Sequence, residues 1–168
     1  MDVYSFSGLI HEHVGGKVSV TSNEIKTYSV KKGDVFFTRT SETVDEIGCA
    51  SVLRENIKDA VFSGFVLRAR PKNNVLDLKF KNYCFSSSFV RKQIMSTSSY
   101  TTRALTNGRL LSVVLLPCPT NIEEQSAIAN MLLDIDKNIE KLQIRLAKTL
   151  QIKQGMMQEL LTGKTRLI

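Results

Sequence analysis

The 168-residue chain has 23 lysine and arginine residues against 16 acidic residues, and 42% of its residues are hydrophobic. This length fits one globular domain with an appendage, and this composition excludes a disordered chain. No run approaches the roughly 18 apolar residues that cross a bilayer, and the N-terminus has no basic region followed by an apolar core. We therefore expect a cytoplasmic protein without membrane contact.

The basic excess is concentrated in the first two-thirds of the chain. Residues 1–115 carry sixteen basic against ten acidic residues, whereas residues 116–168 carry seven against six. A basic domain beside a nearly neutral segment indicates that a polyanion such as DNA or RNA meets the domain, with protein contacts on the segment. A solvated basic surface without a partner explains the charge equally well.

The first part of the chain has the pattern of short strands separated by turns. His11 and His13 alternate as they would on one face of a strand. Residues 35–40 (VFFTRT) follow a turn and predict a strand. The long apolar run at residues 60–70 predicts one or two buried strands. This part therefore predicts a small sheet.

Two short helices and a last strand are expected next. Asp77 is placed to cap the first helix, and the second helix has Val90 and Ile94 on its inner face. A turn at residues 107–108 precedes an apolar run at residues 110–116, which predicts the last strand of the domain.

A long helix ends the chain. Thr120 and Glu123 fit a capping box at its start, and Gly163 fits a left-handed stop at its end. Between them, apolar residues recur at alternating intervals of four and three, which is the pattern of a coiled-coil seam that Thr149 and Lys153 interrupt. We predict that the protein dimerises through the seam residues Ile128, Leu132, Ile135, Ile139, Leu142, Leu146, Met156 and Leu160.

The length of this helix indicates a partner from outside the chain. Forty helical residues at about 1.5 Å each make a rod of roughly 60 Å, about twice the diameter of the preceding domain. The sequence contains no second helix of that length to cover the seam. A helix that folds back on its own domain is the alternative.

No catalytic or metal-binding motif is found. The sequence has no glycine-rich phosphate loop and no Asn-Pro-Pro-aromatic or Asp-Pro-Pro-aromatic tetrapeptide that positions an amino group for methylation. No acid–lysine set completes a nuclease centre at Asp45 and Glu46. Cys49, Cys84 and Cys118 match no zinc spacing and no disulfide framework. We expect a non-catalytic protein with reduced thiols, no metal and no cofactor of its own.

Several motifs resemble those of specificity subunits of type I restriction-modification systems. Residues 33–48 (GDVFFTRTSETVDEIG) are similar to the central signature of their target recognition domains, and residues 65–71 (FVLRARP) to the strand that follows it. Segments between residues 117 and 164 (PCP, EEQ and MQELLTGK) resemble the helical region and the ending of that family. The resemblance covers nearly the whole chain from about Lys31 onward.

The resemblance implies a DNA-reading module with an α+β fold. It implies a small mixed α/β target recognition domain at residues 1–116, followed at residues 117–168 by a long C-terminal α-helix that forms an antiparallel coiled coil. Specificity subunits of this family usually hold two such domains and two such helices, so this chain resembles one half and is expected to form a homodimer. Family domains commonly begin with an aromatic and glycine-containing lead-in that is missing here, and both a natural half subunit and a fragment stay open.

The resemblance also implies partners. Each recognition domain of the family reads half of a split target in double-stranded DNA, and the helices dock the methyltransferase (modification) subunits. Those subunits bind S-adenosylmethionine and methylate adenine, so the cofactor is expected on the partner. A restriction subunit that contains a motor is a further implied partner.

Two polar segments are candidates for DNA contact, because arginine, lysine and hydroxyl side chains meet phosphates and base edges. The candidates are Thr38, Arg39, Thr40 and Ser41 in the first segment and Arg91, Lys92, Ser98, Ser99, Tyr100, Thr101, Thr102 and Arg103 in the second. A buried pair of Arg39 with Glu42 or Asp45 is one alternative, and an ordinary polar loop in the second segment is another. The alternative function is a coiled-coil interaction adaptor with an incidental basic surface.

Overall fold

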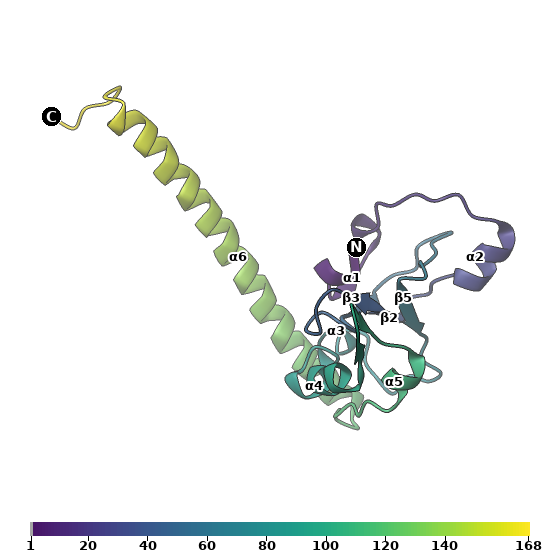
Figure 1. Cartoon of the computed structure of the whole chain (residues 1–168). Coiled ribbons are helices and arrows are strands. Elements are labelled where there is room, and N and C mark those ends of the chain that lie inside the picture. Colours follow the sequence, from purple (N-terminus) through teal and green to yellow (C-terminus); the bar gives the residue numbers. More distant parts are fainter. Residues whose placement is uncertain (1) are drawn as a thin grey trace. The chain divides into compact units, whose positions relative to one another are not determined.

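The structure is a computed structural model that describes residues 2–168. The chain divides into two compact units, Met1–Ala127 and Ile128–Ile168. The first unit contains two small sheets and short helices, and the second is helical, as the labels in Figure 1 show. The predicted α+β class is therefore confirmed.

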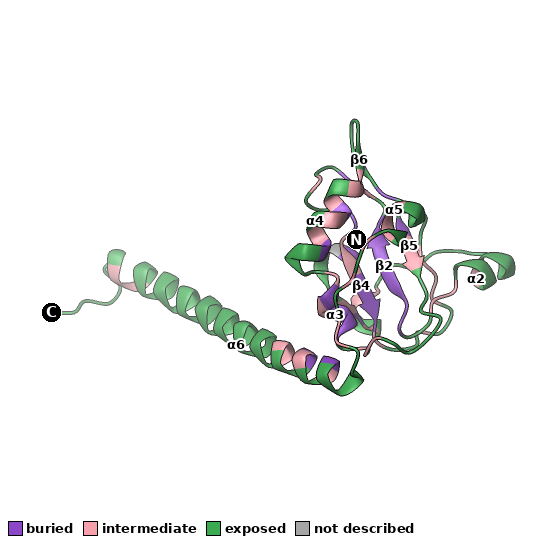
Figure 2. Ribbon diagram, turned by 90° about the horizontal axis from the view of Figure 1, so that it is seen from below, coloured by how far each residue is buried: buried purple, intermediate pink, exposed green. Residues whose placement is uncertain are grey.

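The larger sheet has four strands in the order β1-β4-β2-β5. These are β1 (Gly8–Leu9), β4 (Ala50–Leu53), β2 (Val35–Thr38) and β5 (Val66–Ala69). β2 runs antiparallel to both of its neighbours, while β1 and β4 are parallel. All four residues of β2 are buried, since both faces of the sheet are covered, and Figure 2 shows β2 and β4 in the colour of buried residues. This explains why β2 is an unbroken apolar run without alternation.

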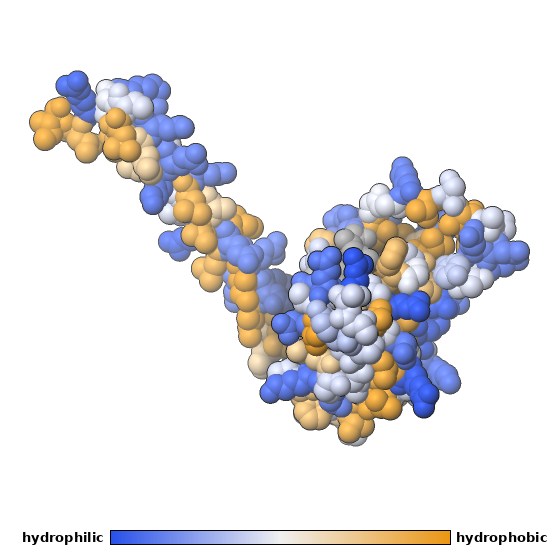
Figure 3. Space-filling model, in the orientation of Figure 1, coloured by the Kyte–Doolittle hydropathy of each residue, from blue (hydrophilic) through white to orange (hydrophobic). Residues whose placement is uncertain are grey.

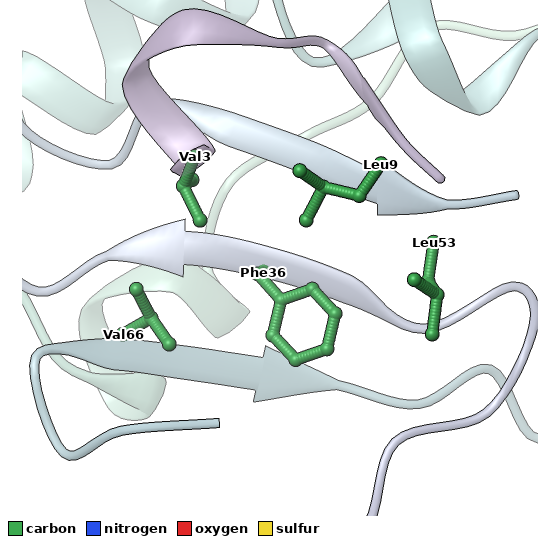
Figure 4. Packing of buried hydrophobic residues seen from close by; sticks show 5 residues of the cluster. All are labelled: Val3, Leu9, Phe36, Leu53 and Val66. Carbon is green, nitrogen blue, oxygen red and sulfur yellow. The ribbon is translucent and has the colours of Figure 1, made fainter. Parts of the chain in front are cut away.

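Two groups of buried side chains cover the two faces of this sheet. Phe36, Leu53 and Val66 point toward one another on one face, together with Val3 and Leu9 (Figure 4). Val35, Phe37 and Val52 form the core on the other face. The strand predicted at residues 35–40 is confirmed in its first four positions.

The smaller sheet has three antiparallel strands in the order β3-β7-β6. They are β3 (Thr40–Ser41), β7 (Ala104–Leu105) and β6 (Ser99–Tyr100). Thr40 is opposite Leu105, and Tyr100 is opposite Ala104. Because β3 follows β2 after a single residue, the chain passes directly from one sheet into the other.

Short helices complete the first unit. They are α1 (Asp2–Ser5), the 3-10 helix η1 (His11–His13), α2 (Ser22–Tyr28), α3 (Lys81–Cys84), α4 (Ser88–Thr97) and α5 (Gly108–Ser112). The inward positions of Val90 and Ile94 on α4 are confirmed, because both are buried. The Asp77 carboxylate accepts from the backbone amides of Lys79 and Phe80, so it caps the turn at residues 78–80. The predicted cap of the helix itself is only partly confirmed, because α3 begins after Phe80 without a side-chain capping bond.

The strand predicted at residues 110–116 is wrong. Asn107 caps α5 by accepting a hydrogen bond from the Leu110 amide at 3.0 Å, so a helix starts where the strand was expected. The chain then runs past α4, where the Gln93 side-chain amide bonds both the N–H and the C=O of Leu115 at 2.9 Å. Gln93 thus occupies the backbone groups that a neighbouring strand would otherwise bond.

One further strand prediction is wrong, and another is confirmed for a single strand. His11 and His13 lie on η1 and not on a strand, and the ring of His13 stacks on Phe6 with centroids 3.7 Å apart. In the run at residues 60–70 only β5 is a strand, because a turn closed by the Val66 N–H and the Ser63 C=O interrupts the run.

Helix α6 (Ile122–Leu161) is continuous over 40 residues. The predicted Thr120 cap is wrong, because the Asn121 side chain accepts from the Glu123 amide at 2.8 Å. The predicted stop is confirmed: Gly163 has φ +72, and its amide donates to the Leu160 carbonyl. Among the described residues, no helix combines the length and the apolar character that crossing a membrane requires.

Candidate nucleic-acid interface

Arg39 is held at the junction of the two sheets. Its N–H donates to the Phe65 carbonyl and its C=O accepts from the Thr106 amide, both at 3.0 Å. These bonds fix the backbone of Arg39 on both sides, while its side chain is exposed. The proposed buried pair with Glu42 or Asp45 does not agree with this exposure, and Glu42 pairs with Arg103 instead.

Thr38 and Ser41 are buried and do not lie on the protein surface. We call the internally bonded residues that support the exposed ones the frame. Thr38 is fully buried, and its hydroxyl donates to the Glu46 carbonyl and accepts from the Cys49 amide. The Ser41 hydroxyl is also buried and donates to the Glu46 carboxylate at 3.1 Å. The prediction that these two residues contact DNA therefore does not agree with the structure, because their hydroxyls are already bonded inside the domain. Thr40 between them is partly exposed.

The second candidate segment forms a hairpin and not an irregular loop. β6 and β7 pair antiparallel, and the Thr101 amide donates to the Arg103 carbonyl across the tip. Ser99, Tyr100, Thr101, Thr102 and Arg103 are all exposed. Figure 2 shows this hairpin, labelled β6, reaching outward from the rest of the first unit. We call these five residues together with Arg39 and Thr40 the hairpin surface.

An exposed ion pair lies beside the hairpin surface. Arg103 approaches the Glu42 carboxylate at 3.8 Å, with side-chain exposures of 65% and 85%. Such an exposed pair contributes little to stability, so Arg103 can exchange it for another anion at small cost. Glu42 was absent from the predicted site, although it follows the first candidate segment directly.

Two exposed aromatic side chains belong to the same region. Tyr100 on the hairpin is 57% exposed and Phe65 is 63% exposed, and the Phe65 carbonyl bonds the Arg39 amide. Aromatic rings beside arginines are typical of surfaces that stack on sugars and bases. Phe65 was missed from sequence because it stands inside an apolar run that predicts buried strands.

The remaining candidates on and after α4 divide into two kinds. Arg91 donates to the Asp45 carbonyl at 2.7 Å, and Ser98 donates to the Met95 carbonyl at the end of α4. Both therefore have structural bonds within the domain. Lys92 is exposed on α4 and is the remaining cation of this group.

The two signature motifs at residues 33–48 and 65–71 are joined by an ion pair between the buried carboxylate of Asp34 and the more exposed side chain of Arg70. Asp34 is 1% exposed and accepts from Arg70 through both oxygens, at 2.8 and 2.7 Å. The hydrogen bond to Asp34 raises the pKa of Arg70. Gly33, at φ +90, makes the turn that directs Asp34 inward, a conformation that favours glycine. These motif residues therefore build the frame that presents the hairpin surface.

Gln125 connects the start of α6 to the rest of the first unit. Its side chain is fully buried and accepts from the Asp77 amide at 2.8 Å. It also donates to the carbonyls of Val75 and Pro119, at 3.0 and 2.8 Å. Three bonds from one buried amide fix the first turn of α6 to two separate loops, which gives a physical role to the glutamine of the EEQ motif.

Metal-binding side chains and thiols are the other reactive groups in the described part of the chain. No group of three or more metal-binding side chains is found among residues 2–168. Burial raises the pKa of the Cys84 thiol to about 12 and also raises that of Cys49. Both thiols are therefore un-ionised near neutral pH, and a thiol in that form is a poor nucleophile and a poor metal ligand.

Comparison with protein families agrees with the motifs. The model of the family described as Type I restriction modification DNA specificity domain matches residues 14–150, which is most of the chain. The chain belongs to this family. Membership implies DNA binding and association with other subunits of a restriction-modification system.

In this specificity domain the second compact unit exposes its apolar side chains. Ile135, Ile139, Leu142 and Leu146 are between 47% and 63% exposed. Figure 3 shows hydrophobic side chains following one another along α6. The predicted seam is thus an apolar stripe that is exposed from Ile135 to Met156 and partly exposed at Ile128, Leu132 and Leu160. Its pairing stays a prediction.

Proposed function

We propose that this chain is a DNA-sequence recognition (specificity) subunit that reads one half of a split target through the hairpin surface. The observation that carries the proposal is the exposed group of arginine, hydroxyl and aromatic side chains on a rigid frame, in a chain that belongs to a DNA specificity family. The frame residues are bonded internally, whereas the residues of the hairpin surface other than the partly exposed Thr40 have their side chains in solvent.

The chemistry of the hairpin surface suits a base-reading role. Arg39 and Arg103 each carry a planar fork of donors that matches the O6 and N7 acceptors of guanine in the major groove. Thr101 and Thr102 provide hydroxyls for phosphates or base edges, and Tyr100 offers a ring for stacking. Lys92 on α4 is assigned to a phosphate, because a flexible ammonium acts as a point charge.

The rest of the proposal concerns the complex. Residues 1–116 act as the recognition domain and residues 117–168 as the spacer that pairs with the helix of a second copy through the exposed stripe. The other faces of α6 dock methyltransferase subunits, which bring S-adenosylmethionine, and a restriction subunit joins that complex. The chain itself performs no catalytic step in this proposal.

The exposed apolar stripe on α6 is also compatible with a second function. Exposed apolar residues along a helix also suit a protein-interaction adaptor, in which the basic surface is incidental. Binding to duplex DNA at increasing salt separates the two candidates. A subunit that neutralises several phosphates loses affinity steeply as salt rises, with a slope of about −0.9 per phosphate contact. An adaptor would show no such binding.

The decisive experiment uses the chain together with a type I methyltransferase subunit. Mapping of methylated adenines in the DNA of cells that express both should give one symmetric split sequence, because two identical recognition domains read two identical half-sites. Methylation at an asymmetric split sequence would contradict the homodimer. Absence of methylation that depends on the chain would contradict the recognition role.

A further inference from the structure

An acid lies beside the cations of the hairpin surface. The Glu42 carboxylate is 85% exposed and is 3.8 Å from the guanidinium of Arg103. This distance is too long for a hydrogen bond, so the two groups attract each other by charge and neither is committed to the other. A carboxylate in a surface that meets phosphates repels them, and it lowers affinity for DNA unless it makes a favourable contact of its own.

The smaller sheet places Glu42 and Arg103 opposite each other. In the register of β3 and β7, Ser41 is opposite Ala104, and both residues are buried. The next step along this register brings Glu42 opposite Arg103. Because successive side chains of a strand point to opposite faces, these two charged side chains share the exposed face of the sheet.

Backbone hydrogen bonds hold both residues of the pair. The Thr43 amide donates to the Ser41 hydroxyl at 3.3 Å, which closes the turn around Glu42. The Arg103 carbonyl accepts from the Thr101 amide across the tip of the hairpin. The backbone of the pair is therefore fixed before a ligand binds, and only the two side chains adjust, which lowers the entropic cost of binding.

The hairpin that carries Arg103 has a shape that DNA accepts. The major groove is about 12 Å wide and admits a two-stranded β-ribbon. β6 and β7 form such a ribbon, which reaches outward from the first unit (Figure 2). Since Glu42 is opposite Arg103 and next to the tip, a ribbon that enters the groove brings both charged groups to the base edges.

A G·C base pair presents the complementary pattern in that groove. Guanine offers the adjacent acceptors N7 and O6, and cytosine offers the N4 amino donor beside them. The guanidinium of Arg103 fits the two acceptors, and the carboxylate of Glu42 fits the donor. An A·T pair presents an acceptor, a donor and an acceptor in turn, so it lacks the two adjacent acceptors that a guanidinium fork requires.

We infer that Glu42 and Arg103 together read one G·C base pair of the target, with Arg103 on the guanine and Glu42 on the N4 amino group of the cytosine. The inference rests on the proposed recognition function and names one base pair that the hairpin surface reads. It also gives a favourable contact to a carboxylate that would otherwise only repel the DNA.

Selection from a pool of duplexes with a random central segment tests this inference with the full chain. The unmodified chain should select a G·C pair at one position of the half-site. Glu42→Ala and Arg103→Ala should each relax the preference at that same position by about tenfold. Glu12→Ala is the matched control, because Glu12 is exposed on η1 outside the hairpin surface and its loss should leave every preference unchanged.

Three results of this selection would overturn the inference. The first is a Glu42→Ala variant that binds all sequences more tightly and equally, which would show that the carboxylate only repels DNA. The second is a loss of preference at different positions in Glu42→Ala and Arg103→Ala. The third is an A·T pair at the position that depends on both residues. Circular dichroism checks that the variants stay folded, as the exposure of both side chains predicts.

Modified bases separate a direct contact of Glu42 from a role in positioning Arg103. N4-methylcytosine keeps the base pair but places a methyl group at the donor position in the major groove. At the selected position it should weaken binding of the unmodified chain by about tenfold and leave binding of Glu42→Ala nearly unchanged. Likewise, 7-deazaguanine lacks the N7 acceptor and should weaken the unmodified chain but not Arg103→Ala. Equal sensitivity of the unmodified chain and Glu42→Ala to N4-methylcytosine would contradict the contact.

The selection also separates this inference from the proposed function. If the unmodified chain selects no sequence, the proposed recognition function is wrong and the inference fails with it. If the chain selects a sequence in which no position depends on Glu42, the recognition function stands and only the inference is wrong.

Discussion

The two compact units differ in how far their apolar side chains are buried. The first unit buries Phe36, Val52 and Ile94 almost completely, in clusters around two small sheets. The second unit leaves Ile139 and Leu146 about half exposed along one helix. Burial of apolar surface is the main favourable term in folding, so the first unit has the means to fold alone and the second needs a partner surface.

The strongest test of this difference places charges in the stripe. Ile135→Glu with Ile139→Glu should weaken dimerisation by at least about 1,000-fold, because four carboxylates would enter the apolar contact of two helices. The first unit should stay folded, since neither residue belongs to its core. Light scattering measures the mass, and tyrosine fluorescence reports on the first unit, which holds all four tyrosines.

The matched control for this test is Ile144→Glu. Ile144 is 63% exposed on α6 but lies outside the stripe, so the same change of side chain should leave the dimer intact. A wild-type dimer in the double variant, or a monomer in the control, would show that the stripe is not the contact surface.

The joint between the loops and α6 should be the most sensitive point of the first unit. Gln125→Leu removes three hydrogen bonds and leaves the Asp77 amide and the Val75 and Pro119 carbonyls without partners. The free energy of unfolding should fall by about 2–4 kcal/mol, because each buried group without a partner costs about 1–3 kcal/mol. Urea unfolding followed by tyrosine fluorescence measures this.

Gln154→Leu is the control for that substitution. Gln154 is exposed on the second unit, so its replacement should change the free energy of unfolding of the first unit by less than about 0.5 kcal/mol. An equal, small effect of both variants would show that Gln125 does not hold the joint.

DNA binding should depend on the hairpin surface and not on basic charge in general. Arg39→Ala and Arg103→Ala should each weaken binding to a half-site by about 1–3 kcal/mol if they read bases. Lys92→Ala should weaken binding to all sequences alike and reduce the salt slope by about one. Fluorescence anisotropy with labelled duplexes measures both effects.

Arg109→Ala serves as the control for loss of one positive charge. Arg109 is exposed on α5, outside the hairpin surface. If all of these alanine variants weaken binding equally and without regard to sequence, the assignment of base-reading residues is wrong.

The smallest expected effect concerns Gly155 in the second unit. A Cβ atom at this position meets nothing within 4 Å, and Gly155 lies on the side of α6 away from the stripe. Gly155→Ala should therefore stabilise the helix by about 1 kcal/mol without changing the dimer. Thermal unfolding followed by circular dichroism tests this, and a destabilised dimer would place another contact at Gly155.

The parts of the fold that the sequence predicted are those with strong local patterns. The continuous apolar run of β2 and the inner face of α4 were correct, as was the glycine stop of α6. The strand expected at residues 110–116 was wrong for two reasons: Asn107, which fits a turn, also caps α5, and the path after α5 depends on Gln93, which is distant in sequence. No local pattern contains that bond.

The candidate site was only partly predictable for a similar reason. Thr38 and Ser41 were predicted to contact DNA from their residue type alone, because hydroxyl side chains are typical of phosphate contacts. Their burial follows from bonds to Glu46 and Cys49, which depend on how the chain turns after β3. Phe65 was missed since its exposure depends on the turn that ends just before β5.

The buried residues that support the hairpin are distinct from the exposed residues at its tip. This difference bears on how new target sequences could arise. Thr38, Ser41 and Ala104 are buried, whereas residues 101–103 are in solvent. Mutations at the tip should therefore be nearly neutral for folding. In the proposed recognition role, selection can then act on them through their DNA contacts alone. A lineage can explore new recognition sequences there by single substitutions, without first acquiring compensating changes in the core.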